Sequence, residues 1–300
     1  MLDRTGIDWL LCMFDFEIYF DNSEPEPATT SSPAFPMAIA ACYIFSKEQC
    51  DHYVRNFDEV RRTEGFEVFH MTDFMANPCQ TKPFCDWDQA KRDRVYYRIA
   101  NLINTRVRTG FAFGVPCESF DLHAPQHMKD ILGKRHFTFA VRCALYLVQQ
   151  WYARYGKGKA VQYVFDRMGK GKGEIMTIFD GMKEFPEVAE SMGVQLNDPD
   201  GFTFQNKEFF KPLQTADILA WNMRRHLQDF ISRGKPDTPP PIRPYFQFLR
   251  KAPIRVGFFR DVQIERGAAE MLEYEEREGK PAFKATRRQL KQWKAAHAAK

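Results

Sequence analysis

Several features that would assign this sequence to a membrane or exported class are missing. No apolar stretch of the 300 residues approaches the ~20 residues that cross a bilayer. The first residues carry mixed charge at Asp3, Arg4 and Asp8, whereas a secretory signal has a basic start followed by an apolar segment. The sequence therefore predicts a cytoplasmic protein with no membrane partner.

The sequence also lacks the regular cysteine spacing of the disulfide bonds that stabilise small exported domains. The seven cysteines are odd in number and follow no regular spacing. Cys79 and Cys85 lie close together, but no second pair stands nearby, as a structural zinc site usually requires. Free thiols in a reducing compartment are the expected state.

Common catalytic motifs are absent as well. The sequence contains neither Gly-x-Ser-x-Gly nor Gly-x-Gly-x-x-Gly, and no cysteine has the context of a nucleophile. The glycine-rich run 167–173 (RMGKGKG) is followed by Glu174 and not by the pattern of a phosphate loop, which excludes a nucleoside triphosphatase. Its basic residues Arg167, Lys170 and Lys172 are still suited to a nucleic-acid backbone. A solvated turn is the alternative.

Charge is close to balanced and does not by itself indicate a nucleic-acid partner. The net charge is +4, but 280–300 is rich in Lys and Arg and has no acidic residue. Such a tail can pair with phosphates, although a solvated helix end explains it equally well. Hydrophobic residues make up 44% of the chain, with 28 Phe, so a sizeable core is possible.

Hydrophobic periodicity predicts an α/β protein. Residues 12–21 alternate with period two, as a strand does, and 36–45 form an apolar second strand. Ser46 and Gln49 match a capping box, which predicts a helix from there to about residue 64, and 66–74 is predicted to be extended. Further strands are expected at 111–117, 160–165 and 202–205, and further helices from Asp86 or Asp88 to 108, and at 136–155, 174–185 and 213–231.

The order of these elements points to a fold class. With the segment 46–109 set aside as an insertion, the order is three strands, helix, strand, helix, strand, helix. This is the succession of the RNase H superfamily, a mixed five-stranded sheet flanked by helices. We therefore expect an RNase H-like domain at 1–233 with a helical insertion. A Pro-rich linker and a basic C-terminal extension are expected at 234–300, and dimerisation and binding of a protein partner are the open alternatives for the extension.

Three aspartates are placed to meet in such a fold. Asp21 ends the first strand and Asp166 ends the fourth, and these strands are neighbours in this arrangement. Asp217 follows Leu213 by four residues and shares the apolar side of the helix 213–231. A buried carboxylate needs a metal or another partner. A backbone amide or Arg224 is the alternative partner for Asp217.

Three short motifs resemble a prokaryotic family called domain of unknown function 3800. They are the runs 69–74 (FHMTDF), 164–167 (VFDR) and 212–221 (PLQTADILAW), and the last is the most distinctive. The resemblance covers about residues 14 to 231. It implies an RNase H-like fold and nuclease activity.

The chain departs from this family at two points. The family's first motif is Asp-Glu-Ser-Gly or Asp-Asp-Ser-Gly, but residues 21–24 read DNSE, so Asn22 replaces an acid. Glu24 is a candidate for another ligand. The helix 136–155 has no Asp or Glu, although RNase H carries an acid there. Two alternatives follow: His70, Asp73 or Glu174 substitutes for this acid, or the protein is a degenerate member.

These residues suggest metal-dependent hydrolysis of DNA or RNA. Mg²⁺ and Mn²⁺ prefer carboxylate oxygens, and two such ions can activate water and neutralise a phosphodiester. We expect Asp21 to bridge both ions, with Asp166 and Asp217 each holding one side. The alternative is a degenerate RNase H-fold protein that binds nucleic acid or a protein partner without cleavage.

Four further residues are candidates for auxiliary roles. His70 and Asp73 form a His-x-x-Asp pair suited to moving a proton or contacting substrate; the alternative is a hydrogen bond from His70 to a nearby carbonyl. Gln214 can orient Asp217 or a water. Glu174 is a weaker metal candidate, because acids in a first helical turn also favour the helix dipole.

Overall fold

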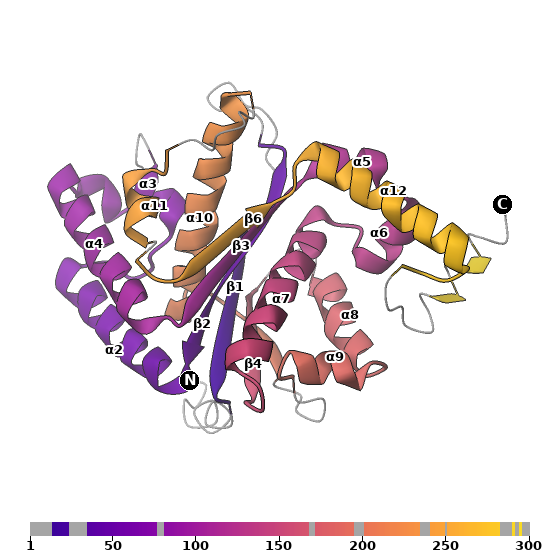
Figure 1. The fold of residues 1–300 in the computed structure, drawn as a ribbon. Coiled ribbons are helices and arrows are strands. Elements are labelled where there is room, and N and C mark those ends of the chain that lie inside the picture. Colours follow the sequence, from indigo (N-terminus) through magenta and orange to yellow (C-terminus); the bar gives the residue numbers. More distant parts are fainter. Residues whose placement is uncertain are drawn as a thin grey trace.

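The computed structural model describes residues 14–23, 35–76, 81–167, 172–194, 201–234, 241–249, 251–282, 290–291 and 294–295. One mixed sheet with the order β5-β4-β1-β2-β3-β6 crosses the molecule, and helices cover both of its faces (Figure 1). The strands are β1 (Phe16–Ser23), β2 (Met37–Ser46), β3 (Thr109–Pro116), β4 (Val161–Asp166), β5 (Phe202–Gln205) and β6 (Ile254–Phe258). The α/β class with a helix-flanked mixed sheet is confirmed.

The sheet has six strands among the described residues, where five were expected. β2 runs antiparallel to β1 and to β3, whereas β4 pairs in parallel with β1 and β5 in parallel with β4. The additional strand, β6, comes from the C-terminal extension and pairs in parallel with β3, from Gly110↔Ile254 to Gly114↔Phe258. Part of the extension therefore belongs to the main sheet.

The helices form two layers with separate cores. The helices on one face are α2 (Lys47–Glu64), α3 (Met71–Met75), α4 (Gln89–Arg106), α10 (Lys211–Ser232) and α11 (Pro244–Leu249). Those on the other are α5 (Cys117–His123), α6 (Gln126–Leu132), α7 (His136–Tyr155), α8 (Lys172–Met182), α9 (Pro186–Ser191) and α12 (Asp261–Glu278). A 3-10 turn, η1 (Phe84–Asp86), precedes α4.

Because helices cover both faces, β1 is buried on both sides. Ile18 and Phe20 point into the α7 layer, and Tyr19 points into the α10 layer. Side chains alternate along a strand, so Glu17 and Asp21 lie on the same face as Tyr19. They are only 1% and 2% exposed. The face of β1 that carries Glu17, Tyr19 and Asp21 is therefore buried, although its side chains are polar.

α10 packs over β1, β2 and β3. At two glycines of β3, other side chains take the space that a side chain would fill. A methyl group at Gly114 would approach Leu227 Cδ1 of α10 to 2.8 Å, and one at Gly110 would approach Tyr43 Cε1 of β2 to 2.6 Å and Leu219 Cδ2 of α10 to 3.3 Å. Glycine at these positions leaves room for these side chains beneath α10, the helix that carries Asp217.

Two local predictions were wrong, namely the capping box at Ser46 and the extended stretch 66–74. Of the two residues suggested as the cap of α4, the structure shows one. Ser46 has the extended backbone of an N-cap, but its side chain makes no cap hydrogen bond among the described residues. The capping box fails because Gln49 instead accepts a hydrogen bond from Arg106 (3.1 Å). The stretch 66–74 is not fully extended, since α3 starts at Met71. Asp88, not Asp86, caps α4 by accepting from the Lys91 N–H (2.7 Å).

No helix of the described residues combines the length and the apolar character required to cross a membrane.

Candidate active site

The parallel pairing of β1 with β4 brings two aspartates to one edge of the sheet. Phe20 pairs with Phe165, and Asp21 and Asp166 come directly after them. The carboxyl ends of parallel strands share an edge, so both side chains reach the same region. Asp21 is fully buried, whereas Asp166 is partly exposed.

Asp217 joins them from α10. This residue is 6% exposed, in agreement with its predicted place on the buried side of the helix. Its Oδ2 accepts a hydrogen bond from the Met71 N–H at 2.8 Å, so a backbone amide supplies one of its partners. Arg224, the other suggested partner, instead lies over the Phe35 ring.

The three carboxylates converge on the ammonium group of Lys207. Lys207 Nζ lies 3.5 Å from Asp21 Oδ2, 3.6 Å from Asp217 Oδ1 and 3.7 Å from Asp166 Oδ2. Burial of Lys207 disfavours its charge, but the carboxylates together outweigh that effect and raise its pKa above the ordinary value. A single lysine thus holds together acids that are remote in sequence.

Lys207 only partly offsets the cost of an ionised Asp21 at this buried position. Burial raises the pKa of Asp21 well above its ordinary value; Lys207 opposes the shift, and Asp217 and Asp166 add to it. Its Oδ1 is buried and has no hydrogen-bond partner among the described residues. The carboxylate therefore has one oxygen that a proton or a further cation can satisfy.

Gln214 fixes the backbone on both sides of this cluster. It is fully buried, accepts a hydrogen bond from the Phe69 N–H (2.9 Å) and donates one to the Lys207 carbonyl (2.7 Å). The Lys207 N–H in turn donates to Asp166 Oδ1 at 3.2 Å. Gln214 therefore holds the Lys207 turn and the segment before α3, and makes no direct contact of this kind with Asp217.

His70 connects the cluster to Asp73. Its Nε2 lies 3.6 Å from Asp217 Oδ1, and its Nδ1 lies 3.5 Å from Asp73 Oδ2. Both His70 and Asp73 also line a hollow of about 450 Å³ together with Glu67, Lys82 and other residues of 65–84. The predicted His-x-x-Asp pair therefore lies between the buried acids and an open surface.

The remaining predicted site residues lie apart from this cluster or outside the description. Glu174 accepts hydrogen bonds from Thr138 Oγ1 (2.7 Å) and the Arg135 N–H (3.2 Å) at the start of α7. Arg167 is exposed after β4, and the exposed Lys172 lies over the Phe204 ring. Glu24 and Lys170 fall outside the described residues.

The cluster has the hard oxygens of a cation site, but its centre is taken by a lysine. No group of three His, Cys, Asp or Glu side chains in the described ranges has the spacing to hold a metal ion. Lys207 Nζ stands where the carboxylates converge, and their hard oxygens are of the kind that Mg²⁺ and Mn²⁺ prefer. The unpartnered Asp21 Oδ1 offers one buried oxygen for such an ion.

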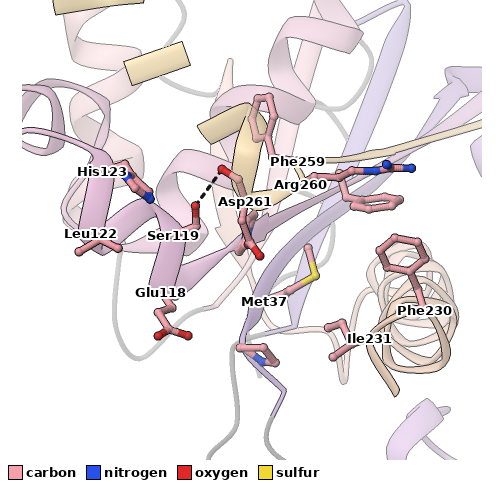
Figure 2. Close-up of a pocket in the computed structure, with 13 residues that line it drawn as sticks. Met37, Glu118, Ser119, Leu122, His123, Phe230, Ile231, Phe259, Arg260 and Asp261 are labelled. Carbon is pink, nitrogen blue, oxygen red and sulfur yellow. Dashed lines mark hydrogen bonds between the residues drawn. The ribbon is translucent and has the colours of Figure 1, made fainter. Parts of the chain in front are cut away.

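A second cavity, of about 300 Å³, lies between α5, the end of α10 and the segment that joins β6 to α12 (Figure 2). Phe230, Ile231 and Phe259 provide apolar walls, and Glu118 and Arg260 are charged side chains in its lining. None of the site residues predicted from sequence belongs to this lining in the described chain. The cavity is therefore separate from the aspartate cluster.

Comparison with protein-family models, with curated proteins and with solved structures gives no match to this chain. The resemblance to domain of unknown function 3800 accordingly stays a prediction.

Sequence reasoning missed Lys207, the centre of the cluster. The available signal was its position: Lys207 follows β5 by two residues, and β5 pairs in parallel with β4 at the edge where Asp166 lies. A lysine just after a strand that neighbours two acid-bearing strands is placed to reach those acids.

Proposed function

We propose that this protein is a metal-dependent nuclease with an RNase H-like core. The observation that carries the proposal is the convergence of Asp21, Asp166 and Asp217 on a single point occupied by a cationic group. The order β5-β4-β1-β2-β3, with antiparallel β1, β2 and β3, supports the RNase H-like part of the proposal. Cytoplasmic location remains part of the same prediction.

Each residue of the cluster has a role in this proposal. Asp21, Asp166 and Asp217 would hold Mg²⁺ or Mn²⁺, which would supply water activation and charge neutralisation at a phosphodiester. His70, between Asp217 and Asp73, can carry a proton between the cluster and the hollow beside it. Arg167 and Lys172 are exposed and can contact the nucleic-acid backbone.

The test is cleavage of labelled DNA and RNA, single- and double-stranded, in the presence of Mn²⁺. We expect Asp217→Asn to reduce the rate by at least ~100-fold, because the amide removes a negative ligand from the cation site. The matched control is Asp229→Asn, an acid on the same helix that pairs with Arg243 (2.7 Å) away from the cluster. Unchanged cleavage by Asp217→Asn, with a folded wild type active, would reject the assignment.

The second candidate is a nucleic-acid-binding protein that has lost catalysis. It is favoured by Lys207 standing at the point of convergence, by Asn22 in place of an acid and by the absence of acids from α7. This candidate predicts retention of labelled nucleic acid without cleavage under any metal tested. Binding without products in the same assay would favour it over the nuclease.

A further inference from the structure

A hollow of about 650 Å³ lies between the C-terminal end of α7 and the edge strand β6. Its lining includes Trp151, Arg154 and Tyr155 from α7 and Arg255 from β6. Arg255 pairs with Phe111 of β3, whose side chain belongs to the core that α7 covers. Directly paired residues of neighbouring strands point to the same face of a sheet, so Arg255 points toward α7.

The described lining of this hollow is positively charged and contains no acidic side chain. Arg154 and Arg255 are both exposed, and neither pairs with an acid of the described chain. The rest of α7 adds none, because 136–155 contains no Asp or Glu. Two guanidinium groups without acid partners at one hollow favour an anion, and their planar fork suits phosphate oxygens in particular.

Two aromatic rings accompany these arginines. Tyr155 is 60% exposed, and the guanidinium carbon of Arg154 lies 6.0 Å from the centre of its ring. Trp151 is buried; its ring centre lies 6.1 Å from that of Tyr155 and 5.2 Å from that of Phe16. Trp151 therefore packs beside Tyr155 from the interior, and the exposed Tyr155 ring can stack on a nucleic-acid base.

The exposure of these side chains distinguishes a polymer from a small ligand. A pocket for a free nucleotide buries most of the ligand surface, whereas Arg154, Tyr155 and Arg255 all stand at the protein surface. A single strand needs no such enclosure, because it gains affinity from charge and stacking contacts at several nucleotides. In a duplex the bases lie inside the stack and cannot reach the Tyr155 ring.

The hollow is remote from the aspartate cluster. Phe16, which contacts Trp151, begins β1, and Asp21 lies five residues further along the strand, or about 16 Å at the usual rise. The two side chains also belong to opposite faces of the sheet, since Phe16 packs in the α7 layer and Asp21 shares the face of Tyr19. A ligand in the hollow therefore does not contact the three acids there.

We propose that this hollow binds single-stranded nucleic acid, with Arg154 and Arg255 on its phosphates and Tyr155 stacked on a base. The proposal goes beyond the proposed function, because the surface is remote from the aspartates and acts whether or not they cleave. It also gives a role to the acid-free helix 136–155, because an acid beside these arginines would repel the phosphates.

The first test removes the charges. A labelled oligothymidylate of about ten nucleotides is titrated with the full chain in EDTA, at several salt concentrations, with fluorescence anisotropy as the readout. We expect the double variant Arg154→Gln, Arg255→Gln to bind at least ~10-fold more weakly. The slope of log affinity against log salt should fall by about 1.4, because each phosphate contact to a single strand contributes about 0.7.

The control for charge is Arg62→Gln. Arg62 is an exposed arginine in the last turn of α2, as Arg154 is in the last turn of α7, and should leave affinity and slope unchanged. A basic residue in a last turn also stabilises the helix end. Arg255→Gln alone separates the two effects, because Arg255 lies on a strand, and should lower the slope by about 0.7.

The second test removes the ring. Tyr155→Ala should weaken binding of the strand at least ~5-fold, whereas Tyr155→Phe keeps the stacking surface and should bind as the wild type does. The matched control is Tyr146→Ala, because Tyr146 lies on the same helix, is also 60% exposed and is not part of the hollow.

Each remaining outcome counts against the proposal. A folded wild type that does not bind the strand, or a folded double arginine variant that binds with unchanged affinity, would overturn it. Thymidine monophosphate that competes as well as the unlabelled strand, or a duplex bound as tightly, would overturn the assignment to single strands. Binding without Mn²⁺-dependent cleavage loses the nuclease function alone, whereas cleavage by a protein whose hollow variants bind normally loses only this proposal.

Discussion

The two ends of β1 each bury an acid on the same face of the sheet, yet they are built differently. Glu17 accepts a hydrogen bond from Tyr19 (2.8 Å) and lies 3.7 Å from Lys47 Nζ. Asp21 shares Lys207 with Asp166 and Asp217, from positions far along the chain. Burial raises the pKa of both acids above their ordinary values.

The difference separates a structural acid from a candidate site. At the Glu17 end, Lys47 faces the buried Glu17 and the exposed Asp51, and these partners come from β1 itself and the start of α2. At the Asp21 end, one lysine faces three acids, which leaves negative charge that the fold does not compensate. Excess buried charge of one sign costs stability and is retained where a ligand uses it.

The largest loss of unfolding free energy is expected when Gln214 is replaced, because this residue holds the backbone around the Asp21 end. Gln214→Ala leaves the Phe69 N–H and the Lys207 carbonyl without their partner in a fully buried place. Each such group costs about 1–3 kcal/mol, so urea unfolding should show a loss of ~2–4 kcal/mol. The control is Gln149→Ala, a part-buried residue that donates to Ser191 and should cost ~1 kcal/mol or less. Equal losses of unfolding free energy in both variants would contradict the claim that the buried hydrogen bonds of Gln214 are unusually stabilising.

A gain in stability, smaller in size than the loss at Gln214, is expected when Asp21 or Glu17 is replaced by its neutral amide. A folded-state pKa above the unfolded value means that stability is full below about pH 4 and is lost as the pH rises through the raised pKa. Asp21→Asn and Glu17→Gln should therefore raise the melting temperature at pH 7.5, by ~2–4 °C for each kcal/mol gained. The gain should be larger for Asp21, whose pKa is raised further.

Thermal melts at pH 7.5 and pH 4 check this expectation. At the lower pH the advantage of both variants should shrink, because the wild-type carboxyls are then protonated in the folded state as well. A wild type that is more stable than Asp21→Asn at pH 7.5 would mean that Lys207 fully compensates the buried charge of the three-acid cluster.

The smallest effect is expected at Ser46, beside the Glu17 end. Its side chain makes no cap hydrogen bond in the described structure, so Ser46→Ala should change the unfolding free energy by less than ~0.5 kcal/mol. Asp88→Ala removes a real cap on the Lys91 N–H and should cost ~1 kcal/mol. Chemical denaturation of both variants compares them directly, and a cost at Ser46 equal to that at Asp88 would contradict the geometry.

The elements found from sequence are those whose signals are local. The alternation in β1, the apolar run of β2 and the stripe of α10 each lie within one segment, and the helix 136–155 was predicted with its observed ends. The short helices α5, α6, α9 and α11 were missed, since brief turns carry little periodicity. Partners that depend on tertiary contact, such as Arg106 for Gln49, cannot be read from local pattern.

The same distinction applies to the candidate site. Asp21, Asp166 and Asp217 could be chosen because strand order and helix face bring them together. Lys207 lies in a turn without periodicity, and its role depends on the distance from Nζ to three remote oxygens. The part of the site set by backbone topology was predictable, and the part set by a long side chain was not.

The pairing of β6 with β3 has a consequence for the order of synthesis. A growing chain that has reached residue 240 already contains every acid of the cluster, but the outer edge of β3 still presents free N–H and carbonyl groups. Such an edge is a template for pairing with other nascent chains. Residues 254–258 close this edge, so a segment that is made after every acid of the cluster protects the molecule against aggregation.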